Sequence, residues 1–457
     1  MNTLEQIYKP GHIAPLSTFR VLFGILLFFH SLSFFFDGSI HQIFYAPEFF
    51  FSAYGLDWVS PLAYPGMYIV FGALALLGLM ISAGYYFRIS SILFVGLYAY
   101  VSSIDRSQAS QFSNFYLLTT FFLALLPSHR YFSLDLLRNP SLRVDYIPRW
   151  CIWVIKLQVA FLFFNAGLAK LNHDWLFLSE PFTTWIRTYW GDSVIGRFFT
   201  NDAIAMMSCW GIVIIEFLGP VAMFFSITKT KVYVFLSVYL LGSFMLLPTG
   251  FMPFQIILLS TVFLNENRHH NITSRIAYFL NDFLQFNPKV FRSGRNLMLA
   301  YKNKLIIPLF FSWIFGLLII SNISLFVQDL EVGFDRKPLK ISDKLIINNL
   351  QGSLRLYVHG ASGSNQQEIN LKEYLTENQI QAVSVNPDLL MQYVRYLKKE
   401  NKMVLDEVSI YAEAEISRNG KDFQPFINPE INLATYKGST KDLLLSMDQV
   451  QKNYPPK

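Results

Sequence analysis

Two ionisable side chains within apolar segments are the residues of this chain best suited to chemistry. Lys170 ends the segment 150–170, and Glu216 lies within the segment 208–228. Charged groups are costly inside a membrane, so they mark either functional sites or buried pairs. A desolvated Lys170 could be a neutral amine and act as a general base. Alternatively, it reaches the membrane surface from a helix end and pairs with Asp174.

Glu216 needs a partner, a proton or a water-filled cavity if its segment spans a membrane. Its candidate partners are Lys156 and Lys170, which both lie on the segment 150–170. A structural ion pair and a functional carboxylate are both open for Glu216. We interpret Lys156 as a packing or ion-pair residue.

Polar groups in the segment 110–127 could support the same chemistry. Asn114 and Tyr116 place an amide and a phenol there, although such groups also form hydrogen bonds between membrane helices. The many aromatic residues could line a pocket for a flat, lipid-soluble ligand. From the residues alone, these alternatives remain open.

Other kinds of site are not indicated. The two cysteines, Cys151 and Cys209, are too few for a zinc site, and the histidines lack metal-ligand spacing. The chain has no phosphate-binding loop, nucleophile elbow, kinase motif or zinc-protease motif. We therefore predict no metal.

The composition indicates a membrane protein with several spans. Of the 457 residues, 53% are hydrophobic and 15% are charged, whereas a soluble protein has about 25% charged residues. The net charge of +6 comes from the apolar part of the chain. The excess of Lys and Arg is therefore expected to determine on which side of the membrane the loops lie. We expect no nucleic-acid partner.

A membrane helix needs about 20 mostly apolar residues. Nine segments are candidates: 16–36, 64–86, 89–104, 110–127, 150–170, 208–228, 232–247, 252–264 and 304–327. The break at Pro248, Thr249 and Gly250 predicts a kinked or re-entrant element. We predict a membrane all-α bundle of about nine transmembrane helices at residues 1–327, followed by a small α+β extracytoplasmic domain at residues 328–457.

Loop charges predict the orientation. With the N-terminus inside, the inner segments hold 15 Lys and Arg residues, whereas the outer loops hold Arg106, Arg187 and Arg197. This distribution follows the positive-inside rule and puts residues 328–457 outside. We expect a multi-pass protein of a bacterial inner membrane, with a cytoplasmic N-terminus and an extracytoplasmic C-terminal domain.

The C-terminal segment has the patterns of an α+β domain. Residues 368–377 and 387–399 are predicted to be helices, the second because its apolar residues have helical spacing. Residues 354–358 and 404–416 alternate like strands.

Several motifs together resemble the vitamin K-dependent gamma-glutamyl carboxylase family and its wider horizontally transferred transmembrane (HTTM) domain. The most specific is FNAGLAKLNHDW at 164–175, similar to the family's aromatic–x–Ala-Gly–x–x–Lys-Leu–x–x–Asp-Trp signature. FRVLFG at 19–24 resembles the opening of the family's first span. YLTENQ at 374–379, NPD at 386–388 and INPEINLA at 427–434 resemble its outer domain.

The resemblance implies an activity and its cofactors. In the family, the lysine that matches Lys170 deprotonates vitamin K hydroquinone, and Glu216 matches a carboxylate position in the next conserved span. Oxygen then converts the quinol into a strong base, which removes a γ-proton from a peptide glutamate, and CO2 is added. The resemblance thus implies Lys170 as the catalytic residue, with supporting or pocket residues Asn114, Tyr116, Glu216, Asp174 and Trp175. The chain is expected to use vitamin K or menaquinone hydroquinone with O2 and CO2. Its partners would be membrane lipid, the quinone and an extracytoplasmic peptide or protein substrate.

Three positions depart from the family's pattern. The family's intramembrane histidine falls on Asn114, which forms hydrogen bonds but cannot carry a proton as imidazole does. A later histidine motif keeps only Gly250, and an outer element keeps Ser353 without its tryptophan. The alternative to a carboxylase is therefore a catalytically degenerate scaffold or binding subunit for a periplasmic or membrane partner. A lipid or quinone carrier is a third reading.

Overall fold

The structure is a computed structural model of the chain. It describes residues 9–52, 55–108, 111–225, 228–284, 350–359, 366–400, 409–418, 422–438 and 440–444. These residues form two compact units. The helical unit lies within 1–37, 68–99 and 112–319, and the sheet unit lies within 38–67, 100–111 and 320–457.

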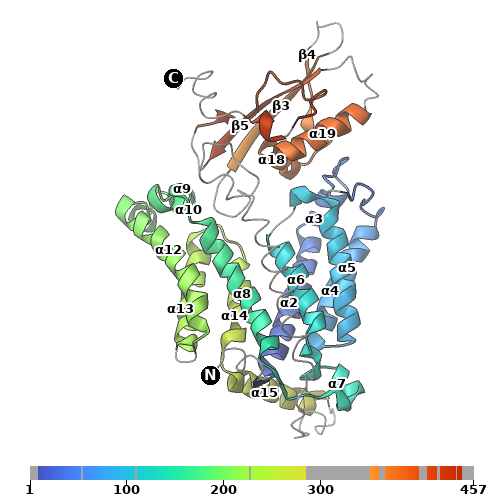
Figure 1. Cartoon of the computed structure of the whole chain (residues 1–457), viewed down its shortest axis with the longest axis vertical. Helices are drawn as coiled ribbons and strands as arrows, with labels where there is room; N and C mark the ends of the chain where they lie inside the picture. Colours follow the sequence, from blue (N-terminus) through green and yellow to red (C-terminus); the bar gives the residue numbers. More distant parts are fainter. Residues whose placement is uncertain are drawn as a thin grey trace. The chain divides into compact units, whose positions relative to one another are not determined.

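The helical unit is built from apolar helices, which Figure 1 shows in blue to yellow-green. Six helices among the described residues are long and apolar enough to cross a membrane: α2 (Ala14–Phe36), α4 (Gly66–Ala83), α5 (Phe87–Ile104), α8 (Trp150–Ala169), α12 (Asp202–Met223) and α13 (Lys229–Leu246). Two shorter apolar helices are α6 (Gln111–Leu125) and α14 (Met252–Ser260), and the 3-10 turn η4 (Thr261–Phe263) extends α14.

Short elements connect these helices at their ends. Strand β1 (Pro10–His12) pairs antiparallel with β2 (Tyr146–Pro148). The remaining elements of this unit are η2 (Ser128–Arg130), α7 (Asp135–Arg138), η3 (Pro140–Leu142), α9 (His173–Phe177), α10 (Phe182–Trp190), α11 (Val194–Phe199) and α15 (Glu266–Leu284).

Eight of the nine predicted spans fall on these helices, and the ninth, 304–327, lies outside the described residues. The predicted break is present, because α13 ends at Leu246 and α14 begins at Met252. Gly250 between them has a φ of 55°, which glycine adopts at little cost because it has no Cβ. A helical membrane bundle is therefore supported, whereas the number nine is not confirmed: six described helices have spanning length.

The described residues of the sheet unit form one antiparallel sheet and two main helices. The strand order is β4 (Gln366–Glu368), β3 (Leu350–His359), β5 (Ser409–Arg418) and β6 (Gln424–Pro425). Strand β3 pairs with β5 along its whole length. The helices are α18 (Glu377–Ser384) and α19 (Pro387–Glu400), with the short elements α3 (Ser39–Phe44), η1 (Arg106–Gln108), η6 (Leu371–Glu373) and η7 (Thr440–Leu443).

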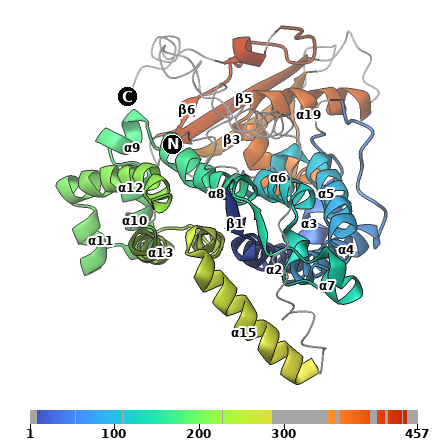
Figure 2. The same cartoon turned by 60° about the horizontal axis from the view of Figure 1, so that its bottom comes forward.

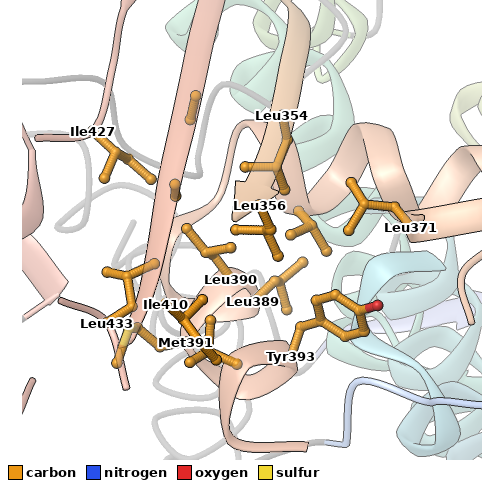
Figure 3. Close-up of a cluster of buried hydrophobic side chains, with 14 of the residues drawn as sticks. Leu354, Leu356, Leu371, Leu389, Leu390, Met391, Tyr393, Ile410, Ile427 and Leu433 are labelled. Carbon is orange, nitrogen blue, oxygen red and sulfur yellow. The ribbon is translucent and has the colours of Figure 1, made fainter. Parts of the chain in front are cut away.

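The core of the sheet unit lies between one face of the sheet and α19. Leu354 and Leu356 of β3 are buried, as is Ile410 of β5, in agreement with the two-residue period of a strand. Leu389 and Leu390 of α19 belong to the same apolar cluster (Figure 3). The predicted α+β character of the C-terminal residues is therefore present.

One local prediction in this unit is wrong. Residues 368–377 are not a helix, because they contain the end of β4 and the turn η6, and α18 begins only at Glu377. Thr376 and Gln379 form a capping box at this point, in which each side chain accepts from the other's backbone N–H. Such a box satisfies free N–H groups at a helix start, so the helix begins after Thr376. The helix predicted at 387–399 is confirmed as α19.

Two loops between membrane helices complete the sheet unit. Phe51, in the connection after α2, is fully buried in the unit's apolar core. Asp105 follows α5 and accepts a hydrogen bond from Gln379 Nε2 at 2.8 Å, and both residues are buried. Residues of both loops therefore belong to the core of the sheet unit.

Candidate functional site

A glycine lets α8 and α12 approach each other at the predicted site. A Cβ atom added to Gly167 would lie 3.0 Å from Cε2 of Phe217 and 3.3 Å from Cβ of Glu216. Small residues permit such close contact between membrane helices. Lys170 lies about one helical turn after Gly167, so its side chain starts beside the same part of α12.

Lys170 and Glu216 form a buried ion pair. Lys170 Nζ lies 2.8 Å from both Oε1 and Oε2 of Glu216, and the two side chains are 13% and 8% exposed. The ammonium also donates to the Ala166 carbonyl at 3.1 Å. The Tyr239 hydroxyl of α13 donates to Glu216 Oε1 at 3.0 Å. One carboxylate therefore joins three helices through charge-assisted hydrogen bonds.

A proline alters the backbone of α12 beside this carboxylate. Pro220 lies inside α12, and proline has no N–H to donate to the carbonyl four residues earlier. That carbonyl belongs to Glu216. The site therefore has a helix carbonyl that lacks its usual intrahelical donor.

The turn after Lys170 is fixed by a cap and a buried aromatic ring. Asn172 Oδ1 accepts from the Trp175 N–H at 2.9 Å and caps α9. Trp175 is fully buried, and its Nε1 donates to the Cys209 carbonyl of α12 at 3.1 Å. Lys170 Nζ lies 5.5 Å from the centroid of a Trp175 ring, within the range of a cation–π contact. Asp174 lies in the first turn of α9, where the helix dipole favours an acidic residue.

The structure decides between the pairings that the sequence left open. Among the described residues, the ion-pair partner of Lys170 is Glu216 on another helix, rather than Asp174. Lys156 does not share this carboxylate, since its Nζ lies over the Phe263 ring, 5.7 Å from the centroid.

Tyr116 belongs to a second polar group on other helices. Its hydroxyl donates to Gln255 Oε1 of α14, and its ring centroid lies 4.7 Å from that of His30 of α2. His30 Nε2 lies 3.2 Å from the Tyr98 hydroxyl of α5. Asn114 is on the same helix as Tyr116, but it is exposed whereas Tyr116 is buried. The predicted residues thus fall into a Lys170 group and a Tyr116 group.

Tyr239 was not found from the sequence. A tyrosine within an apolar helix has no sequence pattern that separates a residue facing a buried carboxylate from one facing lipid. The only usable signal was the unpartnered Glu216, which required donors from some other helix. Within the ranges described above, no group of three or more His, Cys, Asp or Glu residues is arranged to hold a metal ion.

Comparison with known families assigns both parts of the chain. Residues 8–267 match the HTTM domain, which is more than half of the 457 residues, and residues 305–447 match the lumenal domain of vitamin K-dependent gamma-carboxylase. No solved structure matches the chain. The chain belongs to the HTTM-domain family and is a carboxylase-like, multi-pass membrane member of it.

Proposed function

We propose that the protein is a quinol-dependent carboxylase of peptide glutamate, with Lys170 as the base. The buried contact of 2.8 Å between Lys170 and Glu216 carries the proposal. An ion pair in the apolar part of a membrane bundle is costly to desolvate, so it favours a functional role over a merely structural one. The two family matches support the reaction class.

The ion pair gives Lys170 a route to the neutral amine that a base requires. If a proton moves from Nζ to Oε2 along the 2.8 Å contact, an amine and a carboxylic acid remain, and the net charge is unchanged. This transfer removes two charges from an apolar environment, where their desolvation is costly. The amine can then accept a proton from a hydroxyl placed beside it. Tyr239 holds the Glu216 carboxylate in place for this exchange.

The residues around the ion pair fit a flat, lipid-soluble hydroquinone. The Phe164 and Phe217 rings lie 5.1 Å apart on α8 and α12, and a Trp175 ring centroid lies 5.5 Å from Lys170 Nζ. These rings would hold the hydroquinone of vitamin K or menaquinone by stacking and edge contacts. Bound there, the hydroquinone would supply, on oxidation by O2, the base that removes the γ-proton of glutamate before CO2 is added. Lys170 would accept the hydroxyl proton.

Incorporation of labelled CO2 into a glutamate-containing peptide tests this proposal. Purified protein in detergent would receive reduced vitamin K or menaquinol with O2. A general base contributes about 100-fold or more, so Lys170→Ala should lower the rate at least that much. Lys156→Ala changes a lysine of the same helix outside the ion pair and should retain the rate. Equal rates in the wild type and Lys170→Ala would contradict the proposal.

The position of Asn114 favours a second function. The residue that stands in place of the family's histidine is an amide, which cannot serve as an acid or base, and its side chain is exposed rather than buried beside Tyr116. On this alternative the protein is a scaffold or binding subunit for a periplasmic or membrane partner. An imidazole is nevertheless present near α6, because His30 lies against Tyr116. Folded wild-type protein that fixes no CO2 with several quinols and peptides would favour the scaffold.

A further inference from the structure

Helix α15 is attached to the bundle by one face. It lies at the lower end of the helical unit in Figure 1 and extends outward from the other helices in Figure 2. His269, Thr273 and Ala277, four residues apart, are buried on the face that packs towards α2. The start of the helix is held by Glu266 Oε2, which accepts from the His12 N–H at 3.0 Å. This face is therefore a protein contact.

The next face of α15 is apolar and exposed. Ile272, Ile276 and Phe279 are 50%, 43% and 67% exposed. At about 100° per residue, these three side chains fall within a narrow stripe beside the buried face. Large exposed apolar side chains gathered in a stripe mark an interaction surface.

Two arginines border this apolar stripe on the side away from the bundle. Arg268 and Arg275 are exposed and seven residues apart, so they lie on one line along the helix. Beyond them the exposed residues are Asn271 and Ser274, together with Tyr278, whose ring is apolar and whose hydroxyl is polar. Around the helix the order is thus protein contact, apolar, basic and polar. A bilayer surface has the matching order of acyl chains, phosphates and water.

We infer that α15 lies in the membrane interface and binds anionic phospholipid through Ile272, Ile276, Arg268 and Arg275. Its position in the chain supports lipid as the occupant, because Glu266 follows by three residues the turn η4 that ends an apolar helix. The arginines have the charge that complements anionic headgroups. This inference does not depend on the proposed carboxylase activity.

The first test measures which lipid the full-length protein retains after exchange from vesicles of equal phosphatidylglycerol and phosphatidylcholine. Each arginine near an anionic surface contributes about fivefold in affinity. The double variant Arg268→Gln, Arg275→Gln should therefore lower the preference for phosphatidylglycerol about 25-fold. The variant Arg355→Gln, Lys372→Gln removes two exposed charges from the sheet unit and should keep the preference. An unchanged preference in the α15 variant would overturn the inference.

The second test places a spin label on two faces of α15 in phosphatidylglycerol vesicles. The labels would be attached to Ile276→Cys and Ser274→Cys, since the native Cys151 and Cys209 are buried. The label at 276 should be relaxed more by O2, which concentrates in lipid, and the label at 274 more by a water-soluble nickel complex. Greater access of nickel at 276 would overturn the inference. Shielding of 276 from both reagents would also overturn it, since the stripe would then be covered by protein.

Discussion

Glu216 is the residue on which the chemistry of the site depends. Its carboxylate contacts the Lys170 ammonium and the Tyr239 hydroxyl at 2.8 and 3.0 Å. The first contact can exchange a proton and the second only positions the carboxylate, because a phenol remains protonated near neutral pH. Loss of either partner should therefore have a different effect.

Substitution of Glu216 and, separately, of Tyr239 should distinguish proton exchange from positioning. Glu216→Gln keeps the size of the side chain but removes the proton acceptor, so CO2 incorporation should fall at least about 100-fold. Tyr239→Phe removes one hydrogen bond to a charged group, and kcat should fall about tenfold. Tyr233→Phe on the same helix is the control, since its hydroxyl lies 3.4 Å from the Ile257 carbonyl and away from Glu216. Equal effects of Tyr239→Phe and Tyr233→Phe would remove Tyr239 from the site.

His129, outside the spans, predicts how stability depends on pH. Burial, and then the nearby Arg88 and Arg20, lower the pKa of His129 from 6.5 to about 4. Between these two pH values the unfolded state binds a proton at His129 that the folded state does not. The free energy of unfolding is therefore not reduced by His129 above pH 6.5, and it decreases as the pH falls towards 4. The loss is at most about 3 kcal/mol.

Thermal unfolding in detergent from pH 7.5 to 4.5 checks this prediction. The melting temperature of the wild type should fall more steeply with decreasing pH than that of His129→Phe, which has no imidazole at this position. The aromatic replacement suits the site, because the His129 ring already stacks on Phe87 at 5.4 Å between centroids. Parallel curves for the two proteins would show that His129 does not titrate as expected.

At the scale of elements, the site depends on the close approach of α8 and α12. Gly167 has the Phe217 ring and the Glu216 Cβ within 3.3 Å of the place where its own Cβ would be. Gly167→Leu should push the helices apart and lengthen the contact between Lys170 and Glu216, so activity should be lost. Gly211→Leu is the matched control, because a Cβ at Gly211 meets nothing within 4 Å.

The two glycine variants would be compared by CO2 incorporation and by elution as a single folded species in detergent. Gly167→Leu should lose activity while enough folded protein remains to assay, and Gly211→Leu should keep both properties. Full activity in Gly167→Leu would mean that close packing of these helices is not required.

The helices could be predicted from the sequence because a long apolar segment has few alternatives to a membrane-spanning helix. The short segments were less certain: α6 is a helix of 15 residues, and the end of α14 is a 3-10 turn. The start of α18 was missed because a capping box of Thr376 and Gln379 is a local signal that overrides the surrounding composition. Local chemistry, rather than hydrophobicity, thus sets the boundaries of elements.

At the scale of the molecule, distant parts of the chain complete the sheet unit. Phe51 is fully buried among C-terminal residues, and the rings of Phe49 and Tyr396 stack at 4.5 Å between centroids. No local pattern in the sequence signals a contact across more than 300 residues. Lys170 and Glu216 were within reach of sequence reasoning because each was a lone charge in an apolar segment. Phe51 and Tyr239 were not, since aromatic residues are abundant in this chain.

Asp105 should therefore be needed for the stability of the C-terminal domain. Asp105→Ala removes the carboxylate that accepts from one N–H of buried Gln379 at 2.8 Å, and a buried donor without an acceptor costs about 1–3 kcal/mol. Hydrogen exchange at β3 and α18 in the full-length protein should become faster. Asp57→Ala is the control, because Asp57 lies in the connection between α2 and α4 and accepts a hydrogen bond there from Ser52 at an exposed position. Unchanged exchange in Asp105→Ala would show that this contact is not important for the domain.

The most direct test of the account is chemical rescue of the base. CO2 incorporation by Lys170→Ala would be measured with reduced vitamin K, O2 and increasing methylamine, with Glu216→Gln treated in the same way. The account predicts that the small amine restores part of the activity in Lys170→Ala, where a space is left, and none in Glu216→Gln, which still has its lysine. Activity of Lys170→Ala equal to that of the wild type without any amine would contradict the claim that Lys170 is the base.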